Sequence, residues 1–61
     1  MIKDYIDDKG MPYGINPESI ECVRDTTEKK DTPEIEVYLK SGNSLLIKTP
    51  IAKFITKFKD K

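Results

Sequence analysis

Histidine and tryptophan are absent from this chain of 61 residues, and Cys22 is its only cysteine. A structural disulfide needs two cysteines and a zinc site usually needs four Cys or His ligands, so one chain supplies neither. A nucleophilic Cys22 would need a neighbouring base to lower the pKa of its thiol, and no histidine is there to do so. We therefore predict no catalytic residue, no metal and no cofactor, and a protein that is not an enzyme.

Long apolar runs are also missing, since the longest, residues 37–39 and 45–47, have three residues each. A helix that crosses a bilayer needs about 20. Acidic residues occupy positions 4, 7 and 8, where a secretory signal would carry its apolar stretch. A lone thiol is typical of a reducing compartment. The sequence predicts no membrane span and a cytoplasmic protein.

The chain has no net charge, because 11 basic residues balance 11 acidic ones. The charges are nevertheless separated: six Lys/Arg stand against ten Asp/Glu in residues 1–44, and five Lys against one Asp in residues 45–61. One interpretation is that basic residues near the end of a final helix complement its dipole. The other is a contact surface that orients a charged partner or a second copy of the chain.

Small size limits the core. We expect residues 1–61 to form a single domain, in which 36% of the residues are apolar and 36% are charged. A domain this short buries only about 60% of the surface that its unfolded chain exposes. If nearly all apolar residues fill one core, no room is left for a buried catalytic pocket, and the function must lie on the surface.

A β-hairpin is the clearest structural signal. Apolar residues alternate with polar or amphipathic ones over residues 34–40, and positions 45 and 47 are apolar in the strand that follows. A two-residue loop would place the two apolar rows on opposite faces, whereas a three-residue loop over 40–42 aligns them. Gly42 then takes the left-handed position of the turn. The register pairs Leu39 with Asn43, Val37 with Leu45, Ile35 with Ile47 and Glu34 with Lys48.

The end of the chain is predicted to be a helix. Thr49 can cap it, Pro50 suits its first position, and an apolar stripe with helical spacing follows. About ten residues form a marginal helix in water, so the stripe must pack on the sheet. We expect core packing by Ile51, Phe54, Ile55 and Phe58.

Weaker patterns predict the first half of the chain. Strands are expected around residues 2–6 and 11–15, with a turn at 7–10, and a short strand around Ile20 and Val23, where a helix is the alternative. Residues 25–33 contain no apolar side chain and are expected to form a solvated loop. The predicted fold is α+β: a small antiparallel meander of four or five short strands, curled or barrel-like, with one C-terminal helix packed on it.

A glycine turn, an aromatic, an aliphatic and Asn-Pro follow one another as Gly10, Tyr13, Ile15, Asn16 and Pro17. An acid and two aliphatics come next at Glu18, Ile20 and Val23, then a strand, a polar-Gly hairpin, a strand and a helix. In this pattern the chain resembles the FlbD-like (SwrD-like) family of small flagellar and swarming-motility proteins. The resemblance implies a non-enzymatic accessory role in motility that acts through protein contacts.

The face of the hairpin opposite the core is the predicted interaction surface. Tyr38 and Leu46 form an apolar pair there without obvious cover, flanked by Glu36 and Lys48. A small sheet with free edges gains stability when it pairs with a copy of itself. We therefore expect a protein partner, and a homodimer that buries this face.

Basic residues at the end of the chain suggest an alternative. Lys48, Lys53, Lys57, Lys59 and Lys61 could form one stripe for single-stranded nucleic acid, although Tyr38 alone among the tyrosines is expected on an outward strand face. A phage or mobile-element protein that inhibits a host protein is a further alternative. The leading interpretation is a small non-enzymatic protein-interaction or regulatory module, with an accessory role in motility as the function that the resemblance implies.

Overall fold

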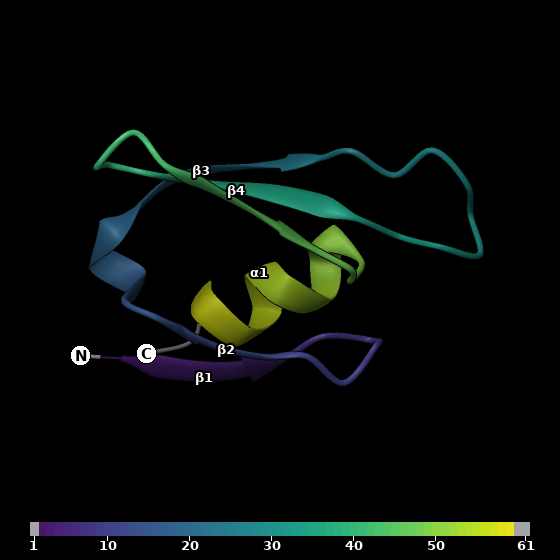
Figure 1. Cartoon of the computed structure of the whole chain (residues 1–61), viewed down its shortest axis with the longest axis horizontal. Coiled ribbons are helices and arrows are strands. Elements are labelled where there is room, and N and C mark those ends of the chain that lie inside the picture. The colour runs from purple at the N-terminus through teal and green to yellow at the C-terminus, as the bar shows by residue number, and fades with distance from the viewer. Residues whose placement is uncertain (1, 60–61) are drawn as a thin grey trace.

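The computed structural model describes residues 2–59 (Figure 1). In these residues five strands and one α-helix follow one another in the order β1 (Lys3–Ile6), β2 (Pro12–Ile15), a 3-10 turn (Pro17–Ser19), β3 (Ile20–Asp25), β4 (Ile35–Leu39), β5 (Ser44–Ile47) and α1 (Ile51–Lys59). β1 and β2 form one antiparallel sheet, and β3, β4 and β5 form another with β4 in the middle. The predicted α+β fold with its C-terminal helix is confirmed.

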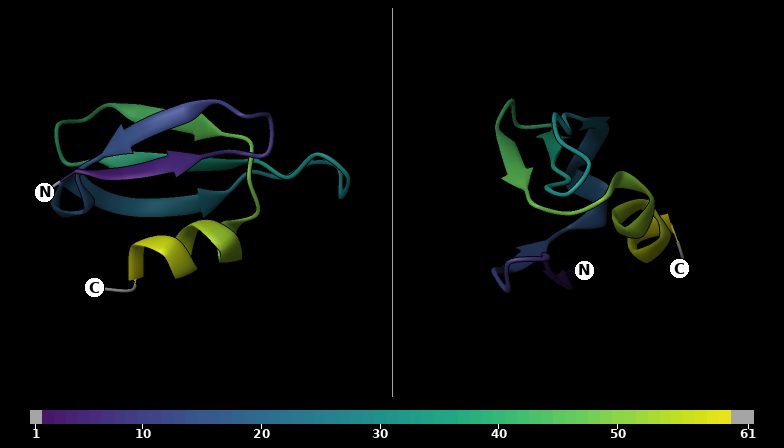
Figure 2. Two further views of the ribbon diagram at one scale, coloured as in Figure 1. Left: turned by 90° about the horizontal axis from the view of Figure 1, so that it is seen from below. Right: turned by 90° about the vertical axis from the view of Figure 1, so that its right-hand side faces the viewer.

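The two sheets stay separate and do not close into a barrel. The β1–β2 hairpin faces the three-stranded sheet, and α1 fills the open side between them (Figures 1 and 2). At the opposite side β2 approaches β5, where the hydroxyl of Tyr13 donates to the carbonyl of Leu46 at 3.3 Å. The backbone N–H of Asp8 donates to the carbonyl of Lys48 at 2.9 Å. The first bond joins β2 to β5, and the second joins the β1–β2 turn to the residue that follows β5.

The β4–β5 hairpin has the predicted register. Ile35 pairs with Ile47 and Val37 with Leu45, so both apolar rows face inward. The Leu39 N–H donates to the Asn43 carbonyl at 2.8 Å and closes the three-residue loop. Gly42 has a φ of 98°, in the left-handed region that a side chain disfavours.

A buried carboxylate organises the β1–β2 turn. Asp7 is 6% exposed, and its Oδ1 accepts the N–H groups of Lys9 and Met11 at 2.9 and 2.8 Å. The Asp7 N–H in turn donates to the Met11 carbonyl at 3.1 Å. Gly10 has a φ of 83°, which the tight reversal requires.

The segment after Asn16 is a strand rather than the alternative helix. Asn16 caps only a short 3-10 turn, with its side chain accepting the Glu18 N–H at 3.1 Å. β3 then pairs with β4, with a register shift between Ile20 and Cys22. The bulge and the six-residue length make β3 longer than the short strand predicted around residues 20–23.

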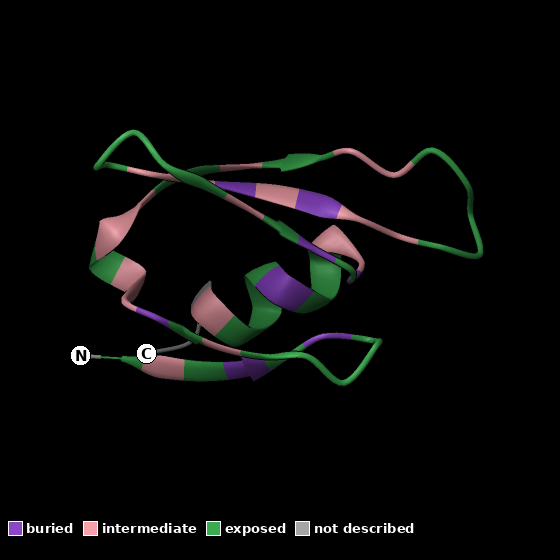
Figure 3. Ribbon diagram, in the orientation of Figure 1, coloured by how far each residue is buried: buried purple, intermediate pink, exposed green. Residues whose placement is uncertain are grey.

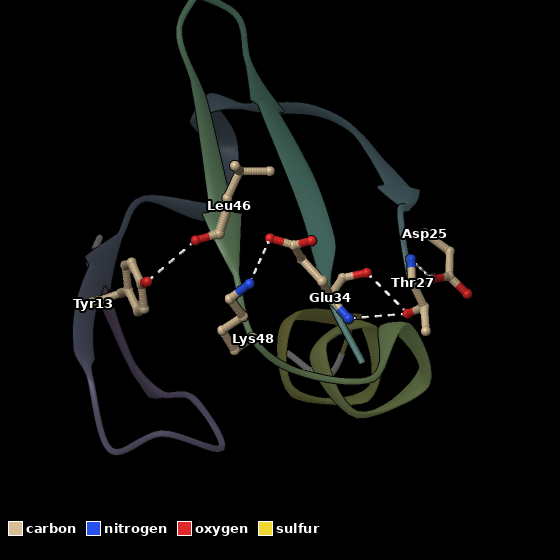
Figure 4. A network of polar contacts seen from close by, with 6 residues as sticks. All are labelled: Tyr13, Asp25, Thr27, Glu34, Leu46 and Lys48. Atoms are coloured by element: carbon tan, nitrogen blue, oxygen red, sulfur yellow. Dashed lines mark hydrogen bonds and ion pairs between the residues drawn. The ribbon is translucent and has the colours of Figure 1, made fainter. Parts of the chain in front are cut away.

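The connection between β3 and β4 is exposed in its middle and tied at its base. The hydroxyl of Thr27 donates to the Glu34 carbonyl at 3.1 Å and accepts the Glu34 N–H at 3.0 Å (Figure 4). Asp25 accepts the Thr27 N–H at 3.0 Å. Hydrogen bonding from the Thr27 side chain, and then from this N–H, lowers the pKa of the Asp25 carboxyl. The predicted loop is confirmed over residues 26–33. Asp25 still belongs to β3, and Glu34, predicted as part of the strand, precedes β4.

α1 begins one residue later than predicted. Its first backbone bond runs from the Phe54 N–H to the Pro50 carbonyl at 3.2 Å, so Pro50 precedes the helix. The Thr49 hydroxyl does not act as the predicted cap, because its hydrogen bond is with the Tyr5 hydroxyl at 2.5 Å, away from the helix N–H groups. The Thr49 hydroxyl therefore takes part in a contact with distant Tyr5 and not in a cap of the adjacent helix.

The core lies where both sheets meet α1 (Figure 3). Its buried apolar members are Tyr5, Ile15, Ile35, Val37, Ile47 and Phe54. Phe54 stacks on Phe58 with ring centroids 4.4 Å apart and meets Tyr5 edge-on at 5.2 Å, which confirms core packing for the two phenylalanines. The expectation that nearly all apolar residues enter the core was wrong, because large side chains on several elements stay exposed: Ile2, Ile6, Met11, Leu46 and Ile55.

Candidate functional site

The six predicted interaction residues fall on two surfaces. Glu36, Tyr38 and Leu46 lie on the outward side of the three-stranded sheet, and Lys48 directly follows β5 on the same side. We call this surface the sheet face. Pairing in the same register adds Cys22 and Arg24 of β3 to the sheet face. Lys53 and Lys57 lie on α1 instead. The predicted single lysine stripe is divided, because Lys48 follows β5 whereas Lys53 and Lys57 lie on α1. Lys61 and the side chain of Lys59 lie outside the described residues.

Polar contacts hold the aromatic member of the sheet face. The Tyr38 hydroxyl donates to Oε1 of Glu36 at 2.8 Å and accepts from Nη1 of Arg24 at 3.4 Å. Tyr38 is half-buried, whereas Leu46 is 57% exposed. The predicted apolar pair is therefore one open leucine beside a tyrosine whose hydroxyl is already engaged.

The sheet face approaches the β1–β2 hairpin at the end of β5, around Leu46 and Lys48. Nζ of Lys48 lies 3.0 Å from Oε2 of Glu34, and Tyr13 reaches the Leu46 carbonyl from the neighbouring β2 (Figure 4). Burial, together with the negative charge of Asp7, raises the pKa of the Tyr13 phenol, while Lys48 opposes the shift. The predicted pairing of Glu34 with Lys48 is confirmed.

Exposed apolar side chains that the sequence did not reveal lie on the β1–β2 hairpin and its turn. Ile2, Ile6 and Met11 are exposed to 63%, 62% and 56%, and Pro12 beside them is also exposed. We call these four residues the hairpin face. Tyr5 and Ile15 point to the core, so strand alternation turns Ile6 outward. Gly14 and Pro12, which oppose Asp4 and Ile6, were the available signal for an uncovered face.

A groove of about 520 Å³ separates β1 from α1. One wall is formed by β1 and the other by α1; the lining residues are Asp4, Tyr5, Ile6, Lys53, Thr56 and Lys57. We call this the edge groove. Nζ of Lys53 reaches Oδ1 of Asp8 at 3.2 Å, and Nζ of Lys3 reaches the Lys57 carbonyl at 2.8 Å. The helix lysines predicted as contacts thus lie beside a strand edge.

Among residues 2–59 no group of three or more acidic, cysteine or histidine side chains is placed to hold a metal ion. Cys22, the only cysteine, is exposed on the sheet face. No helix in the described part of the chain combines the length and apolar character needed to cross a bilayer. What the surfaces offer chemically is apolar contact, ion pairing and unpaired backbone groups.

No family model, curated protein or solved structure matches this chain. The likeness to the FlbD-like family rests on the turn and core residues that carry it. An accessory role of this chain in motility stays a prediction.

Proposed function

We propose that this chain is a small non-enzymatic protein-interaction module whose partner covers the hairpin face. The observation that carries the proposal is that three large apolar side chains of one hairpin, Ile2, Ile6 and Met11, are each more than half exposed. Single exposed apolar side chains are ordinary, but several on one small element are typical of a contact surface. Burying one such side chain contributes about 1.5–3 kcal/mol.

The composition of the core supports a surface function. Large apolar side chains are scarce in so short a chain, and this hairpin leaves three of them outside while Tyr5 and Ile15 fill its inner side. Ile6 and Met11 are 62% and 56% exposed, so the isolated chain gains only part of the stability that full burial of these side chains would give. A protein partner with an apolar patch would recover the burial that the fold leaves unused.

The experiment is affinity capture of partners from a lysate with matched variants. Ile6→Lys with Met11→Lys places two charges on the hairpin face, and Ile55→Lys places one charge on α1, where the isoleucine is 42% exposed. A partner retained by the wild type and by Ile55→Lys, and lost with the double variant, supports the proposal. Equal capture by all three folded proteins, checked by circular dichroism, would contradict it.

The biological setting is also a proposal. An accessory role in motility follows from the FlbD-like resemblance, and inhibition of a host protein by a phage or mobile-element product suits the same surface. The identity of the captured partner separates them: a flagellar component indicates the first, and an unrelated host enzyme the second. We place either role in the cytoplasm.

Nucleic-acid binding has less support. Lys48 and Lys53 each lie beside an acid, Glu34 and Asp8, and the Tyr38 hydroxyl is bonded to Glu36. Binding through phosphates weakens steeply as salt rises. Retention on single-stranded DNA that falls sharply between low and moderate salt would favour this alternative.

A further inference from the structure

β1 has one free edge. Within residues 2–59 its only partner strand is β2, and the bond from the Asp7 N–H to the Met11 carbonyl fixes which residue pairs of the ladder are hydrogen-bonded. Hydrogen-bonded and non-bonded pairs alternate in an antiparallel sheet, so Tyr5 and Lys3 bond to β2. The N–H and C=O groups of Asp4 and Ile6 then point away from β2, and no residue in the range 2–59 bonds to them.

The other edge of this hairpin is obstructed. Pro12 has no N–H to offer on the outward side of β2, and Tyr13 ties β2 to β5 through the Leu46 carbonyl. An added strand therefore has only the β1 side available on this hairpin. That side opens into the edge groove.

The opposite wall of the edge groove is basic. Lys53 and Lys57 are one helical turn apart, which separates them by about 6 Å along α1. Side chains on one face of a strand repeat every two residues, at about 6.8 Å. Because the two spacings are similar, two alternate side chains of a strand added along β1 could each contact one lysine, the first Lys53 and the second Lys57, or the reverse.

We propose that the edge groove binds an extended acidic segment of a partner protein as a third, antiparallel strand on β1. Its outward residues hydrogen-bond to Asp4 and Ile6, and its inward residues present carboxylates to Lys53 and Lys57. The present ion pair of Lys53 with Asp8 is solvated, with side-chain exposures of 60% and 37%, so a new carboxylate displaces it at little cost. Strand addition of this kind derives affinity from backbone bonds and specificity from alternate side chains.

Charge excludes a second copy of the chain as the occupant. Two-fold pairing of β1 with its copy would bring both α1 helices to the inner side of the joined sheet. Lys53 and Lys57 of one copy would then face the same lysines of the other, and like charges in contact are unfavourable. An acidic segment avoids this repulsion between lysines. Asp4, the acidic residue of the groove lining, shares the outward side of β1 with Ile6 and so lies away from the lysine wall.

The inference rests on the proposed function in taking the partner to be a protein. It uses the edge groove, which shares Ile6 with the hairpin face but not Ile2, Met11 or Pro12. The probe is a capped hexapeptide of alternating glutamate and valine, since strands are about five to six residues long. Its binding to the full chain is followed by the amide NMR signals. We expect the largest shifts at Asp4 and Ile6.

Methylated probes test the backbone bonds without altering the protein. In the antiparallel arrangement the valine N–H groups face β1, so N-methylation of the valines should weaken binding at least about tenfold, whereas N-methylation of the glutamates should leave it unchanged. Lys57→Gln should weaken binding about twofold to fivefold, and Lys29→Gln in the exposed loop should not. A lysine–valine peptide should not bind.

Any of four outcomes would overturn the inference: no binding at millimolar peptide, indifference to valine methylation, equal binding of the lysine–valine peptide, or shifts centred away from β1. Met11→Lys separates this test from the proposed function. Met11 belongs to the hairpin face but does not line the edge groove, so this variant should bind the peptide as the wild type does. Failure of peptide binding leaves the capture result of the hairpin face standing.

Discussion

The hydroxyl pair of Tyr5 and Thr49 is the contact that joins the first strand to the end of the sheet. Both residues are buried, at 5% and 0% exposure, and their oxygens are 2.5 Å apart. Neither hydroxyl signals this role in the sequence, since Thr49 before Pro50 has the pattern of a helix cap. The bond forms because the fold brings together residues 44 positions apart.

Tyr5→Phe should destabilise the protein by about 1–3 kcal/mol, because the Thr49 hydroxyl stays buried without its partner. The aromatic packing against Phe54 is retained in this variant, so the loss reports the hydrogen bond. Urea unfolding measures it. The double variant Tyr5→Phe, Thr49→Val should recover part of the loss, and a double variant that loses the sum of two large effects would contradict this account.

Tyr13 links stability to alkaline pH. Its pKa is raised above the ordinary value of about 10, so the folded state favours the neutral phenol. The stabilisation is complete below the pKa of the unfolded chain and is lost as the pH rises through the folded pKa. The free energy of unfolding should fall above about pH 10 more steeply in the wild type than in Tyr13→Phe. Parallel curves for the two proteins would contradict the assignment.

At the scale of elements, the β4–β5 hairpin could be predicted in full because two local rules agree. Alternation of apolar residues needs the Val37–Leu45 register, and that register places glycine at the left-handed position of the turn. The β1–β2 hairpin could not be predicted as well. Apolar residues occur on both of its faces, Tyr5 inward and Ile6 outward, so alternation alone does not say which face the core covers.

Gly42→Ala should cost about 1–2 kcal/mol of stability, because a Cβ disfavours the φ of 98° at this position. Gly42→Asn should cost less, since asparagine tolerates left-handed backbone. Chemical denaturation of the variants gives the comparison. Gly14→Ala is the control, because an added Cβ there meets only the exposed Ile2 side chain at 3.3 Å. An equal loss of stability in Gly42→Ala and Gly14→Ala would contradict the claim that the left-handed backbone of Gly42 disfavours a side chain.

At the scale of the molecule, the exposed apolar residues lie on several sides, and the homodimer through the sheet face stays a prediction. A stable interface buries about 800 Å² per partner, roughly a sixth of the 4544 Å² surface of this chain. The sheet face offers Leu46 as its open apolar residue, while Tyr38 is bonded to Glu36. A weak dimer is the form that such a surface supports.

Sedimentation should therefore show a concentration-dependent dimer for the wild type and a monomer for Tyr38→Glu, Leu46→Lys. Ile55→Lys, which places a single charged side chain on α1, away from the sheet face, should behave as the wild type does. Identical monomers for wild type and double variant would end the homodimer hypothesis. The edge groove and the hairpin face would be unaffected by that result.

The sequence by itself determined the strand order, the β4–β5 register and the C-terminal helix, because these follow from alternation, turn chemistry and helical spacing within short stretches. It also determined that Phe54 and Phe58 pack in the core, since few other side chains of that size are available. The tertiary structure alone decided that the two sheets stay apart, that Thr49 bonds to Tyr5, and that Ile2, Ile6 and Met11 stay outside. Each of these features depends on contacts between segments that are distant in the sequence, and a pattern within one short stretch does not specify such contacts.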